Sequence, residues 1–448
     1  MTYIERPRFS CMLGGVLATI NALPRTVPVV HGAQGCGRNL SSAYAQGGYY
    51  GGGYCNEHSI PSSNIGESDI IFGGAETLTK ELKSSYEIID ADLFVVTTAC
   101  MTDIIGDDVK AVLNDLPDRP PTVFIETGGF KGDCYYGYRR FIEELFRQYI
   151  PRKEPRAEAG TAPHVNLLGL LPGYDPFFRG DLEELSRLLG LLGATVTTFI
   201  TPGQTLADVR KAGAADLNII FNRTYGGELG RQLQESHGLD YWLGDLPVGA
   251  RATSEFLRNI AARLGLAPEA AEAVIRGESE RYYDYVERLA PLVVDFDFQN
   301  YAVVVANSTN ALPYALYLDH ELGWLPTHIY VTDQLTEEQR GLLSARFEEL
   351  VFAEKPELVF ETDAKRIQQH LNTSRPQFLS QQYYERIEPL FILGSTLEHG
   401  FAESLNGFHL SVSHPVINRT AVARGYAGYN GGLNLLCDLS DAQVARRV

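Results

Sequence analysis

TVPVVHGAQGCG (residues 26–37) and LFVVTTACMTDIIGDD (residues 93–108) are the two stretches that decide the fold. Each begins with a short apolar run rich in β-branched residues, Thr26–Val30 in the first and Leu93–Thr98 in the second. Such runs are typical of strands that are buried on both faces of a parallel sheet. The two stretches therefore predict neighbouring parallel strands, each followed by a glycine-containing or polar loop.

A cysteine stands in the loop after each predicted strand, Cys36 in the first stretch and Cys100 in the second, and a third, Cys11, lies upstream in FSCMLGG. In an open α/β sheet, ligands bind in the crevice beyond the carboxyl ends of the strands. Thiolates are soft donors that suit iron–sulfur clusters and related metal sites. Taken singly, each cysteine is more often a buried structural thiol. Three loop cysteines directed to one crevice indicate a metal or cluster site.

The rest of the chain repeats the alternation of apolar runs and helical patterns. The predicted strands are 122–127, 165–171, 196–200, 217–221, 327–333, 358–362 and 390–395, and 301–310 is predicted as a strand that runs into a polar loop. Helical spacing between them predicts parallel, doubly wound sheets. At 448 residues the chain is too long for one core. We expect three doubly wound, Rossmann-like α/β domains, 1–155, 156–300 and 301–448, with a Pro- and charge-rich linker near 152–163.

Composition excludes several classes of partner and site. The formal charge of −18 argues against nucleic acid or an anionic membrane surface. No apolar run is long enough for a membrane span, and the N-terminus shows no signal pattern, so we expect a cytoplasmic protein. No phosphate-loop pattern is present, so no bound nucleotide is predicted. Six cysteines are few for a disulfide scaffold, and Cys437 is interpreted as a small apolar residue on the apolar face of a helix.

Several longer segments resemble the β subunit of nitrogenase component 1 and its relatives. The segments are HGAQGC, the IFGG of 71–74, TTACMTDIIGDD, GGFKGD (128–133), LGDLPVGARATSEFL (243–257) and SHPVINRTAVARGYAGYNGG (413–432). The resemblance extends from about residue 5 to the end of the chain. It implies three tandem doubly wound units, as in the subunits of that family.

The resemblance also implies a cofactor and partners. Cys11, Cys36 and Cys100 fall where the family's β subunit has its P-cluster cysteines. They would ligate an [8Fe-7S] P-cluster-type group shared with an α-like subunit in an (αβ)2 heterotetramer. An ATP-hydrolysing iron protein would supply electrons, and the active-site iron–sulfur cofactor would lie in the α-like partner. This chain would relay electrons, with no catalytic residue of its own.

One position departs from the family pattern. The family often has a serine near the cluster after GF-x-G, whereas this chain has Asp133 followed by Cys134. We predict that one of these two residues approaches the cluster closely enough to ligate on oxidation, Asp133 as a hard oxygen donor or Cys134 as a soft thiolate. The alternative is that Asp133 caps the following turn. His31 is expected to hydrogen-bond within the cluster loop; His58 and Cys55, beside the GGYYGGGYC loop (47–55), have no assigned role.

The substrate is not fixed by these motifs. The short segment before Cys11 and the departure at Asp133 favour a nitrogenase-like reductase, with methylthio-alkane reductase as the first hypothesis. A genuine dinitrogen-reducing nitrogenase, a non-catalytic cofactor-assembly scaffold and a tetrapyrrole reductase with a smaller interfacial cluster are the alternatives. The scaffold is disfavoured because such relatives tend to lack part of the cysteine set.

Overall fold

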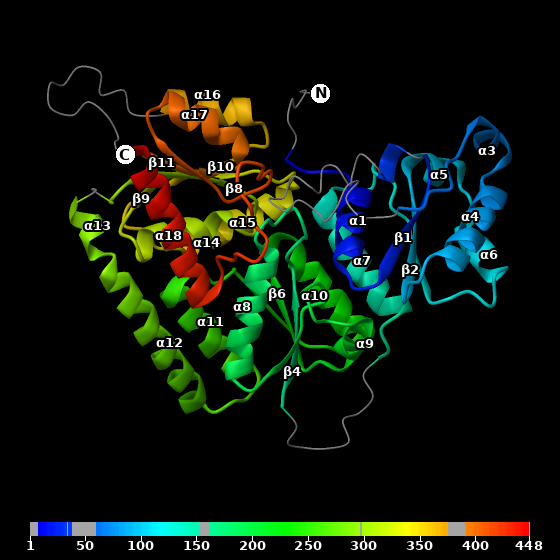
Figure 1. Ribbon diagram of the computed structural model, residues 1–448, viewed down its shortest axis with the longest axis horizontal. Coiled ribbons are helices and arrows are strands. Elements are labelled where there is room, and N and C mark those ends of the chain that lie inside the picture. The colour runs from blue at the N-terminus through cyan, green and yellow to red at the C-terminus, as the bar shows by residue number, and fades with distance from the viewer. Residues whose placement is uncertain are drawn as a thin grey trace.

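The computed structural model describes residues 8–33, 35–37, 60–152, 162–295, 298–374 and 390–447. Within these ranges the chain forms three parallel β-sheets with helices on their faces (Figure 1). The predicted α/β class with parallel sheets is confirmed. In the described part of the chain, no helix is both long enough and apolar enough to span a membrane.

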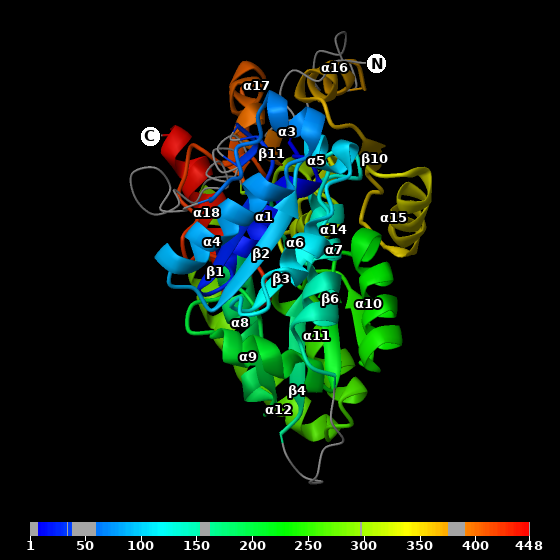
Figure 2. The same ribbon diagram turned by 90° about the vertical axis from the view of Figure 1, so that its right-hand side faces the viewer.

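The first sheet contains the two stretches that decide the fold. Its strand order is β1-β2-β3, and the bounds are β1 Thr26–His31, β2 Leu93–Thr98 and β3 Thr122–Ile125. Its helices are α1 Met12–Ala22, α3 Glu67–Phe72, α4 Ala75–Ile88, α5 Cys100–Ile105, α6 Val109–Asn114 and α7 Cys134–Gln148. Side chains alternate between the faces of a strand. In β2, Leu93 and Val95 accordingly pack with α1 and α7, whereas Phe94 and Val96 pack with α4 and α6. Figure 2 shows these helices around the strands of the first sheet.

The second sheet has the order β5-β4-β6-β7 and lies to the left of and below the first in Figure 1. Its strands are β4 His164–Leu168, β5 Thr195–Thr197, β6 Leu217–Phe221 and β7 Tyr241–Gly244. Its helices are α8 Phe178–Leu191, α9 Leu206–Arg210, the 3-10 turn Lys211–Ala214, α10 Arg223–His237, α11 Gly249–Arg263, α12 Pro268–Arg288 and α13 Ala290–Asp295. The strand order changes direction between β4 and β6, which is the hallmark of a doubly wound sheet.

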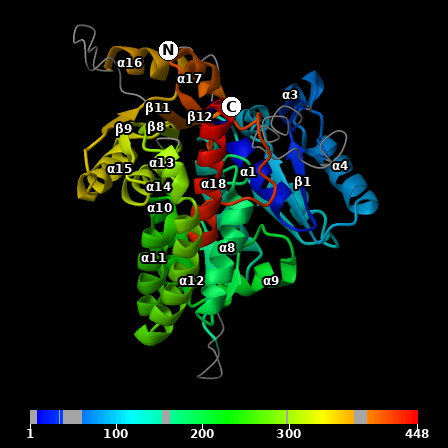
Figure 3. The same cartoon turned by 60° about the vertical axis from the view of Figure 1, so that its left-hand side comes forward.

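The third sheet has the order β10-β9-β8-β11-β12. Its strands are β8 Tyr301–Ala306, β9 Leu325–Val331, β10 Glu357–Phe360, β11 Leu390–Gly394 and β12 Phe408–Ser411. Its helices are α14 Ala311–His320, α15 Glu337–Glu349, α16 Ala364–Ser374, the 3-10 turn Thr396–Glu398, α17 His399–Ser404 and α18 Gly428–Arg447. Figure 3 shows α18 running beside α8 and α12, so the C-terminal helix packs against the second sheet's helices.

The hydrophobic cores do not divide as the sheets do. One core joins side chains of β2, β3, α1 and α7 with those of β4, β6 and α8, and a second lies in the third sheet and takes in Phe177 and Val248. At the N-terminal side, the guanidinium of Arg8 forms a buried ion pair with Glu398, and Arg8 Nη1 donates to Ser395 Oγ at 2.8 Å. The proposed boundaries near 155 and 300 stay a prediction.

Two glycines allow helices α1 and α7 to touch through their backbones. A Cβ on Gly15 would lie 1.9 Å from the carbonyl oxygen of Cys134, and a Cβ on Gly137 would lie 2.2 Å from the carbonyl oxygen of Met12. Backbone contacts continue at the start of both helices, where Met12 N donates to Gly132 O at 2.8 Å. The two helix N-termini are therefore held side by side.

This close packing predicts a strong effect of one methyl group. Gly15→Ala should lower the free energy of unfolding by about 1–3 kcal/mol or more, because the added Cβ has no room against backbone atoms. Gly190→Ala is the matched control: Gly190 lies in helix α8 with nothing near its Cβ position. That variant should gain about 0.5–1 kcal/mol from helix propensity. Urea unfolding of both variants measures the difference, and equal stability would contradict close packing at Gly15.

Candidate metal cluster site

The three predicted ligand cysteines lie at the ends of elements that meet at one edge of the first sheet. Cys11 immediately precedes α1, Cys36 lies in the turn after β1, and Cys100 is the first residue of α5, directly after β2. Strands β1 and β2 are parallel, with His31 paired to Thr98, so their following loops leave from the same edge. The topology therefore brings together residues that are far apart in the sequence.

Gly129 lies between two of the thiols. Its N–H donates to Cys100 Sγ at 3.1 Å. A Cβ at this position would lie 3.1 Å from Cys100 Sγ and 3.3 Å from Cys11 Sγ, so the two sulfur atoms are necessarily neighbours. Cys36 and Cys11 both pack against a small apolar group that includes Leu13 and Val30. Cys11 and Cys100 thus border one space, which a side chain at residue 129 would fill, and Cys36 packs against the same apolar group as Cys11.

The donor set fits a polynuclear cluster better than a single ion. In the described ranges, the three cysteine sulfurs do not form a group whose members all lie within 4.8 Å of one another, the spacing that a single ion needs. Burial raises the pKa of the Cys36 thiol, and the neighbouring Cys100 and Cys11 raise it further. Bound iron would oppose this, because a cation favours the thiolate. The thiols are partly exposed, Cys100 most of all, so the site is accessible from the protein surface.

His31 is fully buried and organises the loop instead of facing the thiols. Its Nδ1 lies 3.0 Å from Ser63 Oγ, and its Nε2 lies 3.0 Å from Asp107 Oδ2. Asp107 also accepts from the backbone N–H of Gly74 at 2.9 Å. Burial lowers the pKa of His31, although the hydrogen bond to Asp107 opposes the shift. Both ring nitrogens are engaged, so His31 fastens the end of β1 to the segment before α3 and to the turn after α5; its partners lie outside the loop that follows β1.

Asp133 has the geometry of a helix cap. It is the N-cap of α7, and its Oδ1 accepts from the N–H of Tyr136 at 2.8 Å. Its Oδ2 accepts from the hydroxyl of Tyr225 at 3.0 Å. Burial raises the pKa of Asp133, and these hydrogen bonds oppose the shift. Both carboxylate oxygens are used within the chain, which favours the capping alternative. Ligation on oxidation stays a prediction.

The thiol of Cys134 points into the core. Its side chain is fully buried in the apolar core that also contains Met12 and Val16. Burial raises its pKa well above that of an exposed thiol, and the adjacent Asp133 adds to the effect. A change of side-chain direction would be needed for Cys134 to reach the three partly exposed cysteines. Its ligation on oxidation also stays a prediction, with less support from the geometry.

One interpretation from the sequence is wrong. Cys437 does lie on a helix, α18, but it is exposed and not on the buried face. The helix buries Leu435, Leu436 and Leu439 instead. The apolar stripe of the run LNLLCDL is thus narrower than its composition suggests. Cys55, His58 and the loop 47–55 lie outside the described residues.

An exposed apolar surface adjoins the thiols, and the sequence did not reveal it. Ile71, Phe72, Ile104 and Phe130 are 72%, 86%, 75% and 62% exposed. They belong to α3, α5 and the glycine loop beside Cys100; α3 contacts α5, and the N–H of Gly128 donates to Asp103 of α5 at 3.0 Å. Large apolar patches on a soluble protein mark interaction surfaces. The run IIF before GG could have indicated this surface, because a helix as short as α3 buries none of its three apolar side chains.

The structure thus combines parallel α/β sheets, cysteines in the loops that follow strands β1 and β2, and an exposed apolar surface near Cys100. The family model described as nitrogenase component 1 type oxidoreductase matches residues 11–443. The chain belongs to this family, whose members are subunits of oxidoreductases.

Individual relatives narrow the comparison. The chain is 27% identical over 468 aligned residues to the nitrogenase molybdenum-iron protein beta chain of Bradyrhizobium diazoefficiens, covering 97% of this chain and 83% of the relative. It is 26% identical to a subunit of the light-independent protochlorophyllide reductase of Heliobacterium modesticaldum, covering 79% and 68% respectively. The solved structure of nitrogenase Cp1 at pH 6.5 superposes with a TM-score of 0.78 at 17% identity, covering 100% of this chain and 94% of that one, which supports the fold.

The capping geometry of Asp133 makes a prediction that separates cap from ligand. Asp133→Ala should lower the free energy of unfolding by about 1 kcal/mol, because it removes the cap, whereas Asp133→Asn keeps an acceptor and should lose less. If Asp133 acts only as a cap, both variants should leave the oxidised-state EPR signal and the midpoint potentials unchanged. A changed signal in both variants would instead establish the carboxylate as a ligand. Cys134→Ala, measured in parallel, tests the thiol in the same way.

Proposed function

We propose that this chain is the β-type subunit of a nitrogenase-like, ATP-dependent reductase. In this proposal Cys11, Cys36 and Cys100 hold a P-cluster-type [8Fe-7S] group shared with an α-like subunit. The observation that carries the proposal is the meeting of the Cys11 and Cys100 thiols at Gly129, with Cys36 packed against the same apolar group as Cys11. Family membership and the similarity to a nitrogenase beta chain support it.

The bound cluster would store and pass on single electrons. The chain's own residues prepare the place for it. The N–H of Gly129 donates to Cys100 Sγ, and such hydrogen bonds withdraw charge from a ligand sulfur and tune the potential of a cluster. Apolar side chains behind Cys11 and Cys36 keep water from that side. The electrons would pass to an active-site iron–sulfur cofactor in the α-like partner, so this chain relays electrons and holds no catalytic residue.

The exposed apolar surface supports the proposed partners. Burying a large apolar side chain stabilises an interface by about 1.5–3 kcal/mol, and four such side chains stand uncovered beside the thiols: Ile71, Phe72, Ile104 and Phe130. A shared cluster also needs ligands that this chain does not supply. We therefore propose an (αβ)2 heterotetramer that receives electrons from an ATP-hydrolysing iron protein, in the cytoplasm. The net charge of −18 gives no support to a nucleic acid partner.

The ligation proposal predicts the effect of removing each thiol. Cys11→Ala, Cys36→Ala and Cys100→Ala should each lower the iron content of the purified complex and loosen its assembly, because the cluster bridges the two subunits. Cys437→Ala is the matched control, since Cys437 is also exposed but lies on α18. Iron analysis and light scattering measure both effects. Wild-type iron and spectra in all three variants, or an iron-replete soluble monomer of this chain, would contradict the proposal.

For the reaction, we propose reduction of small methylthio-alkanes with cleavage of a C–S bond. A genuine dinitrogen-reducing nitrogenase is the alternative, and a cofactor-assembly scaffold is a further one that the full set of three cysteines disfavours. The similarity to a protochlorophyllide reductase supports a tetrapyrrole reductase as the second candidate. That candidate has a smaller interfacial cluster, so the iron content per αβ pair distinguishes it from an [8Fe-7S] group.

Turnover by the purified complex decides among these substrates. With its iron protein, ATP and a low-potential reductant, the complex should release thiol from small thioethers. The competing hypotheses predict ammonia from dinitrogen, or reduction of a tetrapyrrole. Acetylene reduction is measured alongside as a general test of reductase competence. Thioether turnover no faster than that of a Cys100→Ala complex would contradict the methylthio-alkane hypothesis.

A further inference from the structure

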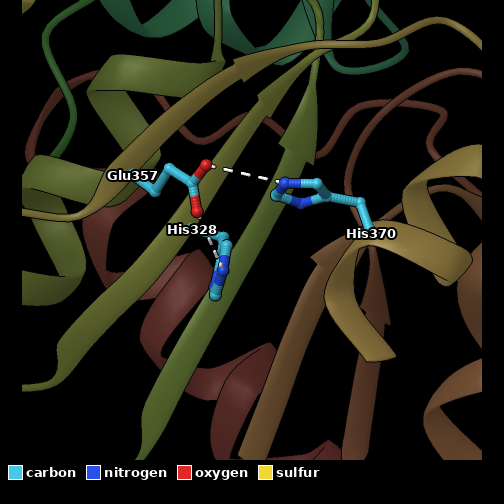
Figure 4. A group of neighbouring side chains, drawn as sticks. All are labelled: His328, Glu357 and His370. Atoms are coloured by element: carbon cyan, nitrogen blue, oxygen red, sulfur yellow. Dashed lines mark ion pairs between the residues drawn. The ribbon is translucent and has the colours of Figure 1, made fainter. Parts of the chain in front are cut away.

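A second group of metal-ligand side chains lies in the third sheet, separate from the cysteines. His328 of β9, Glu357 of β10 and His370 of α16 place one ligand atom each so that all three lie within 4.8 Å of one another. Figure 4 shows the carboxylate of Glu357 lying between the two imidazole rings. In the described part of the chain this is the one group of at least three such side chains with that spacing.

Backbone geometry brings the three residues to one face of the sheet. Glu357 and His328 are directly paired across the parallel strands β10 and β9, so their side chains project from the same face. The register between β8 and β9 shifts just before His328, where Val303 pairs with His328 and Thr327 is left over. Such bulges re-aim side chains and are enriched beside functional sites. Helix α16 covers this face through Ile367 and Leu371, which carries His370 to the other side of the carboxylate.

Both imidazoles are oriented by hydroxyl groups. The Nδ1 of His370 lies 2.9 Å from the hydroxyl of Tyr330, and the Nδ1 of His328 lies 3.0 Å from Thr327 Oγ1. The Nε2 of His370 faces Glu357, and the Nε2 of His328 faces both Glu357 and Ser374. Histidines that bind metals are usually held in this way, with one nitrogen on an orienting partner and the other on the metal. Ser374 Oγ, 2.9 Å from His328 Nε2, is a fourth donor atom beside the group.

The distances match the edges of a metal polyhedron better than direct hydrogen bonds. His328 Nε2 lies 3.4 Å from Glu357 Oε2, and His370 Nε2 lies 3.6 Å from Glu357 Oε1. Direct charge-assisted hydrogen bonds are shorter, about 2.7–2.9 Å. Two ligands at about 2.0–2.1 Å from a tetrahedral Zn²⁺ lie roughly 3.4 Å apart. His328 is buried, whereas the side chains of Glu357 and His370 are 52% and 38% exposed, so an ion can reach the group from solvent.

We propose that His328, Glu357 and His370 form a binding site for a divalent transition-metal ion, with Zn²⁺ as the best fit to two imidazoles and one carboxylate. Ser374 or a water molecule completes the coordination. The ion fastens the edge strand β10 and helix α16 to β9. Edge strands are held on one side only, so a link of this kind stabilises the outer border of the third sheet.

The test uses the complete heteromeric complex with its cluster in place, stripped of loosely bound metal with a chelator. Zn²⁺ titrated into it should bind with one additional ion per chain, and zinc-edge X-ray absorption should show two imidazoles and no sulfur among the ligands. His370→Ala and Glu357→Gln should each weaken binding by at least about 100-fold. Tyr330→Phe should weaken it by about 10-fold, because it only orients His370.

His399→Ala is the matched control, since His399 also faces an acidic residue, Glu403, at 3.9 Å, but belongs to no group of three ligand side chains with metal-site spacing among the described residues. It should leave Zn²⁺ affinity unchanged. Iron content and circular dichroism of each variant establish that folding and the cysteine site are intact, and the Glu357→Gln variant keeps the size of a half-exposed side chain. Unchanged Zn²⁺ binding in both ligand variants, sulfur among the ligands, or no binding at all would overturn the proposal and leave an ordinary His–Glu–His ion-pair network.

Discussion

The backbone contact between helices α1 and α7 is the constraint on which the cysteine site depends. Gly15 and Gly137 let the two helices approach until backbone atoms touch, and no other residue type fits there without moving a helix. The contact places the N-terminus of α1, with Cys11, against the loop that ends at Asp133; Cys11 and Asp133 form an antiparallel backbone bridge. Because Gly129 lies in the same loop, the helix contact also fixes the distance between Cys11 and Cys100.

A second set of contacts fixes the other two thiols. The N–H of Ala99 donates to the carbonyl oxygen of His31 at 2.9 Å, and the hydroxyl of Thr102 donates to the same oxygen at 2.8 Å. Farther inside, Asn307 donates to Asp175 at 2.6 Å, which joins the carboxyl end of β8 to the second sheet, and burial raises the pKa of Asp175 to about 7. Networks of this kind hold the three sheets in one arrangement.

The buried central strands are the most predictable part of the fold. The strands predicted at Leu93–Thr98 and Leu217–Phe221 have the bounds that the structure shows, because a continuous apolar run has no other stable place. Strand β7, Tyr241–Gly244, is absent from the prediction because it is a half-buried edge strand with no such run. The placement of Cys36 and Cys100 at one edge of the first sheet followed from their positions after predicted strands, whereas Cys11 is brought there by the contact of α1 with the loop before α7. By contrast, two features depend on contacts between distant segments, which no local pattern reveals. Asp133 is held by Tyr225, and the His328–Glu357–His370 group is completed by helix α16.

The central claim is that the three thiols of this chain hold iron at a subunit interface. A crystal structure of the complex, with anomalous diffraction recorded on both sides of the iron absorption edge, tests it most directly. The account predicts iron peaks within bonding distance of the sulfur atoms of Cys11, Cys36 and Cys100, with further irons bound by the partner chain. Iron peaks that leave these three sulfurs without a bond, or iron present only inside the partner, would contradict it.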